Sequence, residues 1–174
     1  MKKIALLLVF SICVFNCSDD ETNLFNIQDK AYVLTHYIIE NNVDLNADGI
    51  FSNDLLTEKN CFVNLMYFRE DFQIGSPASH FLAAYVDVES EDAPIQKTNC
   101  FHWDGAYLNY TQNETRLRLT YGEELLFSGD LSENNTILTL ILPNEQLFTD
   151  EFLYEDGTIG DYTGDVTAIY ELVE

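Results

Sequence analysis

The segment Arg116-Leu117-Arg118-Leu119-Thr120-Tyr121 alternates between polar and apolar side chains. Successive side chains of a β-strand point to opposite faces, so a period of two predicts a strand with one buried and one solvated face. Leu117, Leu119 and Tyr121 are expected to share the buried face. This strand is therefore predicted to be half exposed, and it indicates a β protein.

Similar runs, rich in β-branched and aromatic residues, recur on both sides of this segment and are separated by polar turn clusters. Two of the runs, 62–68 and 137–142, are apolar on both faces and are expected to be covered on both sides, with an inward-facing ligand surface as the alternative. A short helical turn is expected to follow an N-cap at Ser52 or Asn53 and to reach Glu58. Strands are predicted near residues 32–40, 62–69, 81–88, 106–111, 115–121, 125–129, 136–142 and 163–172.

This pattern predicts an all-β fold, an antiparallel meander of about eight strands joined mainly by short turns. Such a meander closes into an up-and-down barrel, which removes exposed strand edges. A β-sandwich is the alternative. The chain of 174 residues has the length of one domain.

Composition excludes some classes of function. Hydrophobic residues make up 47% of the chain, which predicts a folded core. The chain has 30 acidic against 8 basic residues, a formal net charge of −22. Such a field repels phosphate backbones and anionic lipid headgroups, so nucleic-acid binding is not expected.

The N-terminus carries an export signal. Met1-Lys2-Lys3 is a short positive region, and Ile4 to Phe15 is an almost continuous apolar run. At a helical rise of about 1.5 Å per residue this run reaches roughly 18 Å, well short of a bilayer core of about 30 Å. Residues 1–16 are therefore predicted to be a signal peptide.

The end of the run resembles a bacterial lipobox, Val14-Phe15-Asn16-Cys17, in which Cys17 becomes the lipidated first residue. The next residues, Ser18-Asp19-Asp20-Glu21, resemble the acidic tag that sends lipoproteins of the Bacteroidota to the cell surface. A plain acidic linker is the alternative. We expect residues 17–29 to be this linker and residues 30–174 to form a single β domain.

The order of features resembles the lipocalin-like lipoproteins of the Bacteroidota: a lipobox, an opening strand, a DxNxDGxxxxDL segment, a cysteine and a β meander. The resemblance implies a barrel attached to the outer membrane through its lipid alone. It places the protein on the cell surface, with the periplasmic face as the alternative. It also implies a small apolar or amphipathic ligand.

The loop at 44–54 spaces its oxygen ligands like an EF-hand, with Gly49 at the turn. Oxygen ligands alone favour calcium over zinc or copper. An Asx-rich turn without metal is the alternative. The candidate ligands are Asp44, Asn46, Asp48, the Ile50 carbonyl and Ser52, closed by Asp54 or Glu58.

Two cysteines, Cys61 and Cys100, remain once Cys13 is removed and Cys17 is acylated. In an exported protein they are candidates for a disulfide. A metal or redox pair and two free buried thiols are the alternatives.

Two other polar clusters give less specific predictions of a site. His102 and Trp103 form a candidate recognition patch, with a core tryptophan as the alternative. The acidic, glycine-containing segment 155–165 is expected to be a mobile hairpin loop.

No catalytic motif is present, so an enzyme is not expected. Two functions are carried forward: a non-catalytic barrel for a small apolar or amphipathic ligand, and an accessory module that binds a protein or glycan through exposed loops.

Overall fold

The computed structural model describes residues 26–59, 61, 65–70, 72–74, 80–88, 94–102, 107–132, 134–143 and 148–173. It confirms the all-β prediction: within these residues, strands dominate and the one helix is a single turn. That helix is too short to cross a membrane, and the described residues contain no other candidate. The elements are β1 (Ala31–Val43), β2 (Ser52–Asp54), α1 (Leu55–Glu58), β3 (Leu65–Phe68), β4 (Phe72–Ile74), β5 (His80–Asp87), β6 (Ile95–His102), β7 (Leu108–Asn113), β8 (Arg116–Tyr121), β9 (Glu124–Leu131), β10 (Ile137–Leu142), β11 (Phe148–Leu153), β12 (Ile159–Asp161) and β13 (Val166–Leu172).

The larger of the two sheets is mostly a meander. Its nine strands follow the order β13-β10-β9-β8-β7-β4-β3-β1-β2, and β13 additionally pairs with β1. All of these pairings are antiparallel. Neighbouring strands of this sheet alternate in direction, so successive connections lie at opposite ends. Three short connections lie at one end: β3–β4, β7–β8 and β9–β10. Three long connections leave from the other end: β1–β3, β4–β7 and β10–β13.

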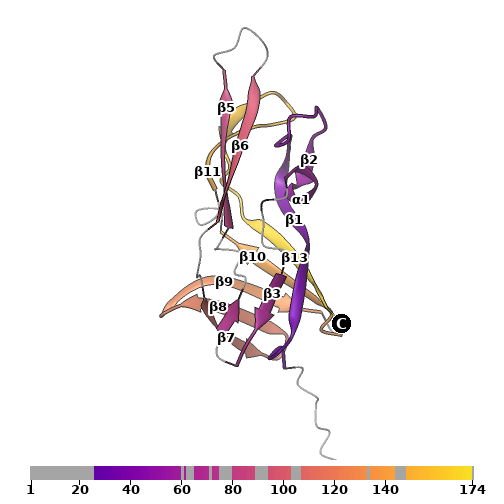
Figure 1. The fold of residues 1–174 in the computed structure, drawn as a ribbon, viewed down its shortest axis with the longest axis vertical. Coiled ribbons are helices and arrows are strands. Elements are labelled where there is room, and N and C mark those ends of the chain that lie inside the picture. The colour runs from indigo at the N-terminus through magenta and orange to yellow at the C-terminus, as the bar shows by residue number, and fades with distance from the viewer. Residues whose placement is uncertain are drawn as a thin grey trace, which may run out of the picture.

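These three long connections build a second unit, which we call the distal lobe: residues 44–58 with β2 and α1, and the four-stranded sheet β12-β11-β5-β6. Figure 1 shows this lobe at one end of an elongated molecule, and the C-terminal end of β13 at the opposite end. Strand β11 belongs to the β10–β13 connection and pairs in parallel with β5, which belongs to the β4–β7 connection. The long strand β1 runs through both units (Figure 1).

A register shift between Leu34 and His36 lets β1 serve both units. Tyr32 and Leu34 are buried before the shift, whereas Tyr37 and Ile39 are buried after it. A β-bulge inserts one unpaired residue and turns the following side chains to the other face. One strand therefore contributes to the core along its whole length.

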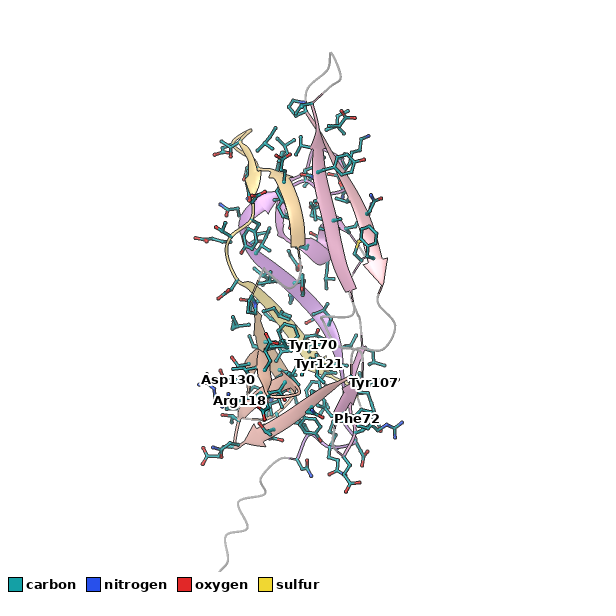
Figure 2. All side chains as sticks on the ribbon, turned by 90° about the vertical axis from the view of Figure 1, so that its left-hand side faces the viewer. Phe72, Tyr107, Arg118, Tyr121, Asp130 and Tyr170 are labelled. Atoms are coloured by element: carbon teal, nitrogen blue, oxygen red, sulfur yellow. A yellow bond between two sulfur atoms is a disulfide. The ribbon has the colours of Figure 1, made fainter. Side chains whose placement is uncertain are left out.

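The core continues across the larger sheet. Its largest fully buried side chains include aromatic rings from several strands, and Phe68 packs edge-on against both Tyr32 and Tyr110. Leucines of β8, β9 and β10 belong to the same buried cluster. Figure 2 shows Tyr170 among the strands of the larger sheet and Arg118 at its outer side.

The eight predicted strands are present, and five further strands were missed. Strands β2, β4 and β12 have three residues each, too few for a period to be recognised. Strand β6 is largely polar, and β11 carries the polar run Thr149-Asp150-Glu151 between its apolar ends. Residues 62–64 of one predicted strand lie outside the described residues.

Two burial predictions were wrong. Strand β10 is not covered on both sides, since Ile137 and Ile141 are 39% and 40% exposed. Leu65 is likewise exposed at the start of β3. Tyr121 does not share the buried face of Leu117 and Leu119, because it is the last residue of β8 beside a tight turn and is 67% exposed.

Candidate functional site

The predicted calcium loop folds around the Asp44 carboxylate. Its two oxygens accept hydrogen bonds from the backbone N–H groups of Asp48, at 3.1 Å, and Gly49, at 2.8 Å. The side chains of Asn46 and Asp48 also accept bonds from N–H groups two residues ahead, which is the geometry of Asx turns. Gly49 has a φ of 84°, a left-handed conformation that glycine adopts without strain.

Helix α1 directs Glu58 toward this loop. The Glu58 side chain is buried, and its Oε2 atom accepts a hydrogen bond of 3.1 Å from the backbone N–H of Leu45. Burial raises the pKa of Glu58, and the negative charges of Asp44 and Asp48 raise it further. Three carboxylates therefore share one region, where their mutual repulsion is unfavourable without a positive charge.

Asp54 has a different set of partners. Its Oδ1 atom accepts bonds from the backbone N–H groups of Tyr37 and Leu56, and Oδ2 lies 2.7 Å from Nδ1 of His36. Burial acts to raise the pKa of Asp54, but these hydrogen bonds and the histidine lower it overall. Asp54 is thus the N-cap of α1, which corrects the expectation of Ser52 or Asn53.

The structure thus divides the predicted ligands into two groups. Asp44, Asn46, Asp48 and Glu58 gather at the loop, whereas Asp54 lies against β1. Ser52 bonds to the backbone of Asp54 and to Thr57, while the Ile50 side chain is exposed. Among the described residues, no group of three His, Cys, Asp or Glu side chains has the spacing of a preformed metal site.

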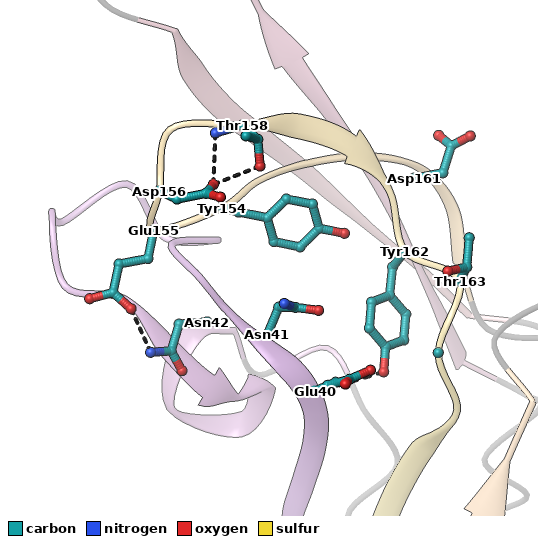
Figure 3. A pocket seen from close by; sticks show the side chains of 11 residues that line it. Glu40, Asn41, Asn42, Tyr154, Glu155, Asp156, Thr158, Asp161, Tyr162 and Thr163 are labelled. Atoms are coloured by element: carbon teal, nitrogen blue, oxygen red, sulfur yellow. Dashed lines mark hydrogen bonds between the residues drawn. The ribbon is translucent and has the colours of Figure 1, made fainter.

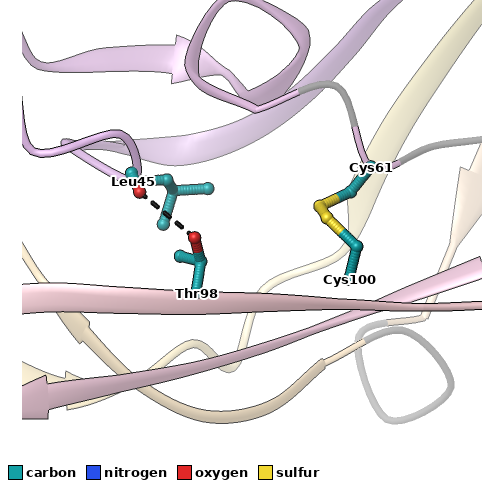
Figure 4. The surroundings of a disulfide bond; sticks show 4 residues. All are labelled: Leu45, Cys61, Thr98 and Cys100. Carbon is teal, nitrogen blue, oxygen red and sulfur yellow. Dashed lines mark hydrogen bonds between the residues drawn. A yellow bond between two sulfur atoms is a disulfide. The ribbon is translucent and has the colours of Figure 1, made fainter.

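Cys61 and Cys100 lie at disulfide distance, with 5.3 Å between their Cα atoms. Figure 4 shows this bond joining the segment after α1 to β6. A hydrogen bond of 3.4 Å from the Thr98 hydroxyl to the Leu45 carbonyl makes a second link between the same regions. The 44–58 segment is therefore fixed to the smaller sheet by one covalent and one polar contact.

A pocket of about 520 Å³ opens in the distal lobe. It lies between the end of β1 and the β11–β12 hairpin with the segment that follows it (Figure 3). We call it the distal pocket. Carboxylates, amides, hydroxyls and two tyrosine rings line it, and its lining contains no lysine or arginine: Glu40, Asn41, Asn42, Tyr154, Glu155, Asp156, Thr158, Asp161, Tyr162, Thr163 and Gly164.

The walls of the distal pocket are held by hydrogen bonds. The amide of Asn42 donates to Glu155 at 2.7 Å, which ties β1 to the hairpin (Figure 3). The Tyr162 hydroxyl donates to the Asp165 carbonyl and accepts from the backbone N–H of Glu40. Burial raises the pKa of Tyr162, and the nearby carboxylates of Glu40 and Asp165 add to this shift.

The pocket was not predicted from the sequence. The segment 155–165 was expected to be a mobile hairpin loop, but it contains β12 and forms one wall of the pocket. The other wall comes from residues 40–42, more than a hundred residues earlier. The mixture of acidic residues and tyrosines in 154–162 was the only local signal.

The buried face of the larger sheet is filled by side chains where it is described. Tyr32, Phe68, Phe127 and Tyr170 are all 0% or 1% exposed. The buried hydroxyl of Tyr170 has no hydrogen-bond partner within the described residues. Burial raises the pKa of Tyr170, so the hydroxyl stays protonated and available as a donor.

Some of the predicted site residues lie outside the described part of the chain. Cys17 and Trp103 are outside the described residues, and His102 is the last residue of β6. Comparisons of the chain with models of protein families, with curated proteins and with solved structures find no match.

Proposed function

We propose that this protein is a non-catalytic binding module, anchored in the outer membrane by a lipid on Cys17, that binds a glycan at the cell surface. The distal pocket is the binding site. The observation that carries the proposal is this pocket of about 520 Å³, within the range of about 300 to 1,000 Å³ typical of ligand sites. Its lining offers aromatic rings beside many hydrogen-bonding groups.

The chemistry of the lining suits a sugar without negative charge. A sugar ring presents hydroxyl groups, which bond to carboxylates and amides, and an apolar face, which packs on an aromatic ring. Tyr154 and Asn41 present such groups to the pocket, and both lie on its inner side in Figure 3. The carboxylates of Glu40, Glu155 and Asp161 would repel an anionic ligand.

The position of the pocket suits surface display. The backbone N–H of Ile27 bonds to the Gln112 side chain, and that of Asp29 bonds to Phe68. These contacts hold the residues before β1 at the end of the molecule opposite the distal lobe (Figure 1). A lipid on Cys17 would therefore leave the pocket facing away from the membrane.

The ring of strand pairings supports a lipocalin-like barrel over a sandwich. Eight strands are hydrogen-bonded each to the next, in the order β1, β3, β4, β7, β8, β9, β10 and β13. The last of them, β13, also pairs with the first, β1. A ring of eight strands has no free edge along these pairings and an interior that side chains can fill.

Calcium has a structural role in this proposal. Asp44, Asn46, Asp48 and Glu58 are the protein ligands, with Glu58 as the closing carboxylate in place of Asp54. Burial raises the pKa of Glu58 and the charges of Asp44 and Asp48 add to it; an ion there offsets this repulsion. It would fix the 44–58 segment and, through β1, the adjoining wall of the distal pocket.

The test is isothermal titration calorimetry with a panel of neutral oligosaccharides. At least one should bind, and Tyr154→Ala should weaken that binding by about five- to thirtyfold, as expected for losing an aromatic contact of roughly 1 to 2 kcal/mol. Asn41→Ala, at an exposed position, should also weaken it.

Tyr121→Ala removes an exposed ring outside the pocket and should leave the affinity unchanged. Thermal melts check that each variant is folded. Absence of binding to every neutral oligosaccharide, or equal losses in the Tyr154 and Tyr121 variants, would refute the glycan proposal.

One observation favours a second candidate, a small amphipathic ligand inside the barrel. The buried Tyr170 hydroxyl is a polar atom for which a partner is expected. A ligand or an ordered water would supply it. Native mass spectrometry of protein purified from its source separates the candidates, because a retained small molecule adds mass that Tyr170→Phe should remove and Tyr154→Ala should not.

A further inference from the structure

The outer face of β8 carries two arginines side by side. Arg116 and Arg118 are exposed, whereas Leu117 and Leu119 between and beyond them are buried. Residues two apart on a strand point the same way, roughly 6 to 7 Å from each other. Their guanidinium groups can therefore reach one ligand together.

Neither arginine has a carboxylate partner in the described part of the chain. The one ion pair there joins His36 to Asp54. The remaining arginine of the protein, Arg69, lies over the Tyr67 ring at 4.6 Å. In a chain with 30 acidic and 8 basic residues, two neighbouring arginines without an ion pair are unexpected.

Both arginines line a groove of about 380 Å³, separate from the distal pocket. The pairing of β7, β8 and β9 places Thr111 and Ser128 on either side of Arg118, and Asn113 beside Arg116. These three side chains also line the groove and can donate hydrogen bonds. No carboxylate is among its lining residues.

We propose that this groove binds an oxyanion, a carboxylate, sulfate or phosphate group, through Arg116 and Arg118. A guanidinium presents a planar fork of donors that matches two oxygens of such a group. Two forks on one face, with hydroxyl and amide donors beside them, accommodate one such group or consecutive groups along a polyanion. The rest of the acidic surface offers no comparable cluster among the described residues.

Asp130 is the competing charge on the neighbouring strand. It lies opposite Arg116 on β9. Figure 2 shows Asp130 and Arg118 at the outer side of the larger sheet. Carboxylates farther away act weakly at physiological salt, where the screening length is about 8 Å. Removing the Asp130 charge should therefore strengthen binding, and removing either arginine should weaken it.

The experiment measures binding of fluorescent dextran sulfate, with neutral dextran as the reference and inorganic sulfate, phosphate and acetate as competitors. Dextran sulfate should bind and neutral dextran should not. Arg118→Ala and Arg116→Ala should each weaken binding by about tenfold or more, which is the loss expected for a charge-assisted hydrogen bond. Asp130→Asn should strengthen it.

Lys97→Ala is the matched control, because it removes one exposed positive charge from the distal lobe and should change the affinity little. Competition by inorganic ions would identify a free-ion site, and binding of the polymer alone would identify a polyanion site. Binding only to vesicles that contain anionic lipid would identify a headgroup site. Each of these three results supports the proposal if the binding is weakened by Arg118→Ala.

An affinity that is unchanged in both arginine variants, or lost equally in the Lys97 variant, would overturn it. The readout does not involve the distal pocket, so this proposal can fail while the glycan proposal stands, and the reverse also holds.

Discussion

Asp54 shows how one side chain can join two elements. Its carboxylate caps α1 and also bonds to the backbone of β1 and to His36. Asp54 was expected as a closing metal ligand, whereas its two oxygens bond to the backbone of α1 and β1 and to His36. Short polar side chains at a helix start are selected by the local backbone, so the capping role follows from its position.

Replacing Asp54 by alanine should destabilise the protein by about 1 to 2 kcal/mol, the usual loss for a helix N-cap. Since the pKa of Asp54 is lowered in the folded state, its contribution is complete above the unfolded value and is lost as pH falls through the folded value. Urea unfolding at neutral and acidic pH measures this. Asn53→Ala is the control, and an equal loss in both variants would contradict the assignment of the cap.

Gly129 is required for close packing between β9 and β10. A Cβ atom there would meet the Thr139 carbonyl and the Leu140 side chain. Gly129→Ala should destabilise the protein by about 1 to 3 kcal/mol because the two strands must separate. Gly160→Ala is the matched control, since its added Cβ meets nothing within 4 Å. A thermal melt in which both variants match the wild type would show that the strands can adjust.

At the scale of elements, the loop 44–50 and α1 act as a unit, because Glu58 bonds back to Leu45. If the unit binds calcium in the native state only, excess calcium should raise the melting temperature and a chelator should lower it. Glu58→Gln should abolish the difference, whereas Glu155→Gln should retain it. An unchanged melting temperature, with no calcium detected by elemental analysis, would remove calcium from the proposal.

The disulfide should stabilise the fold by restricting the unfolded chain. Cys61 and Cys100 are 39 residues apart in sequence, for which chain entropy gives about 4 kcal/mol. The double variant Cys61→Ser and Cys100→Ser should lose a similar amount in urea unfolding. Reducing agent should destabilise the wild type to a comparable extent and leave the double variant unchanged. Equal sensitivity of the two proteins to reductant would contradict this explanation.

At the scale of the whole molecule, charge is the dominant feature. A net charge of −22 opposes the compact state by self-repulsion, which salt screens. Raising sodium chloride from about 0.01 to 0.5 M should therefore raise the melting temperature at pH 7. Near pH 4.1, where the sequence has no net charge, the effect should be much smaller. An equal effect at both pH values would indicate general salting-out instead.

The whole molecule also explains why some predictions succeeded. The longer strands of the larger sheet have one apolar face, so their local pattern indicated them, whereas β2 and β4 have too few residues to show a period. Strand β6 is largely polar, and β11 pairs with β5, which comes from a different long connection. Gln96 makes this clear, because its buried amide joins β5, β6 and β11, which no local pattern predicts.

The sequence alone determined the β architecture, the cysteine pair and the loop around Gly49, because each follows from neighbouring residues or from a short count of reactive groups. The tertiary structure decided which carboxylate closes on the loop, and it assembled the distal pocket and the arginine groove. Those sites combine side chains from separate strands, such as Asn42 with Glu155 and Arg118 with Ser128. Strand pairing brings such residues together, and pairing depends on the packing of the whole chain.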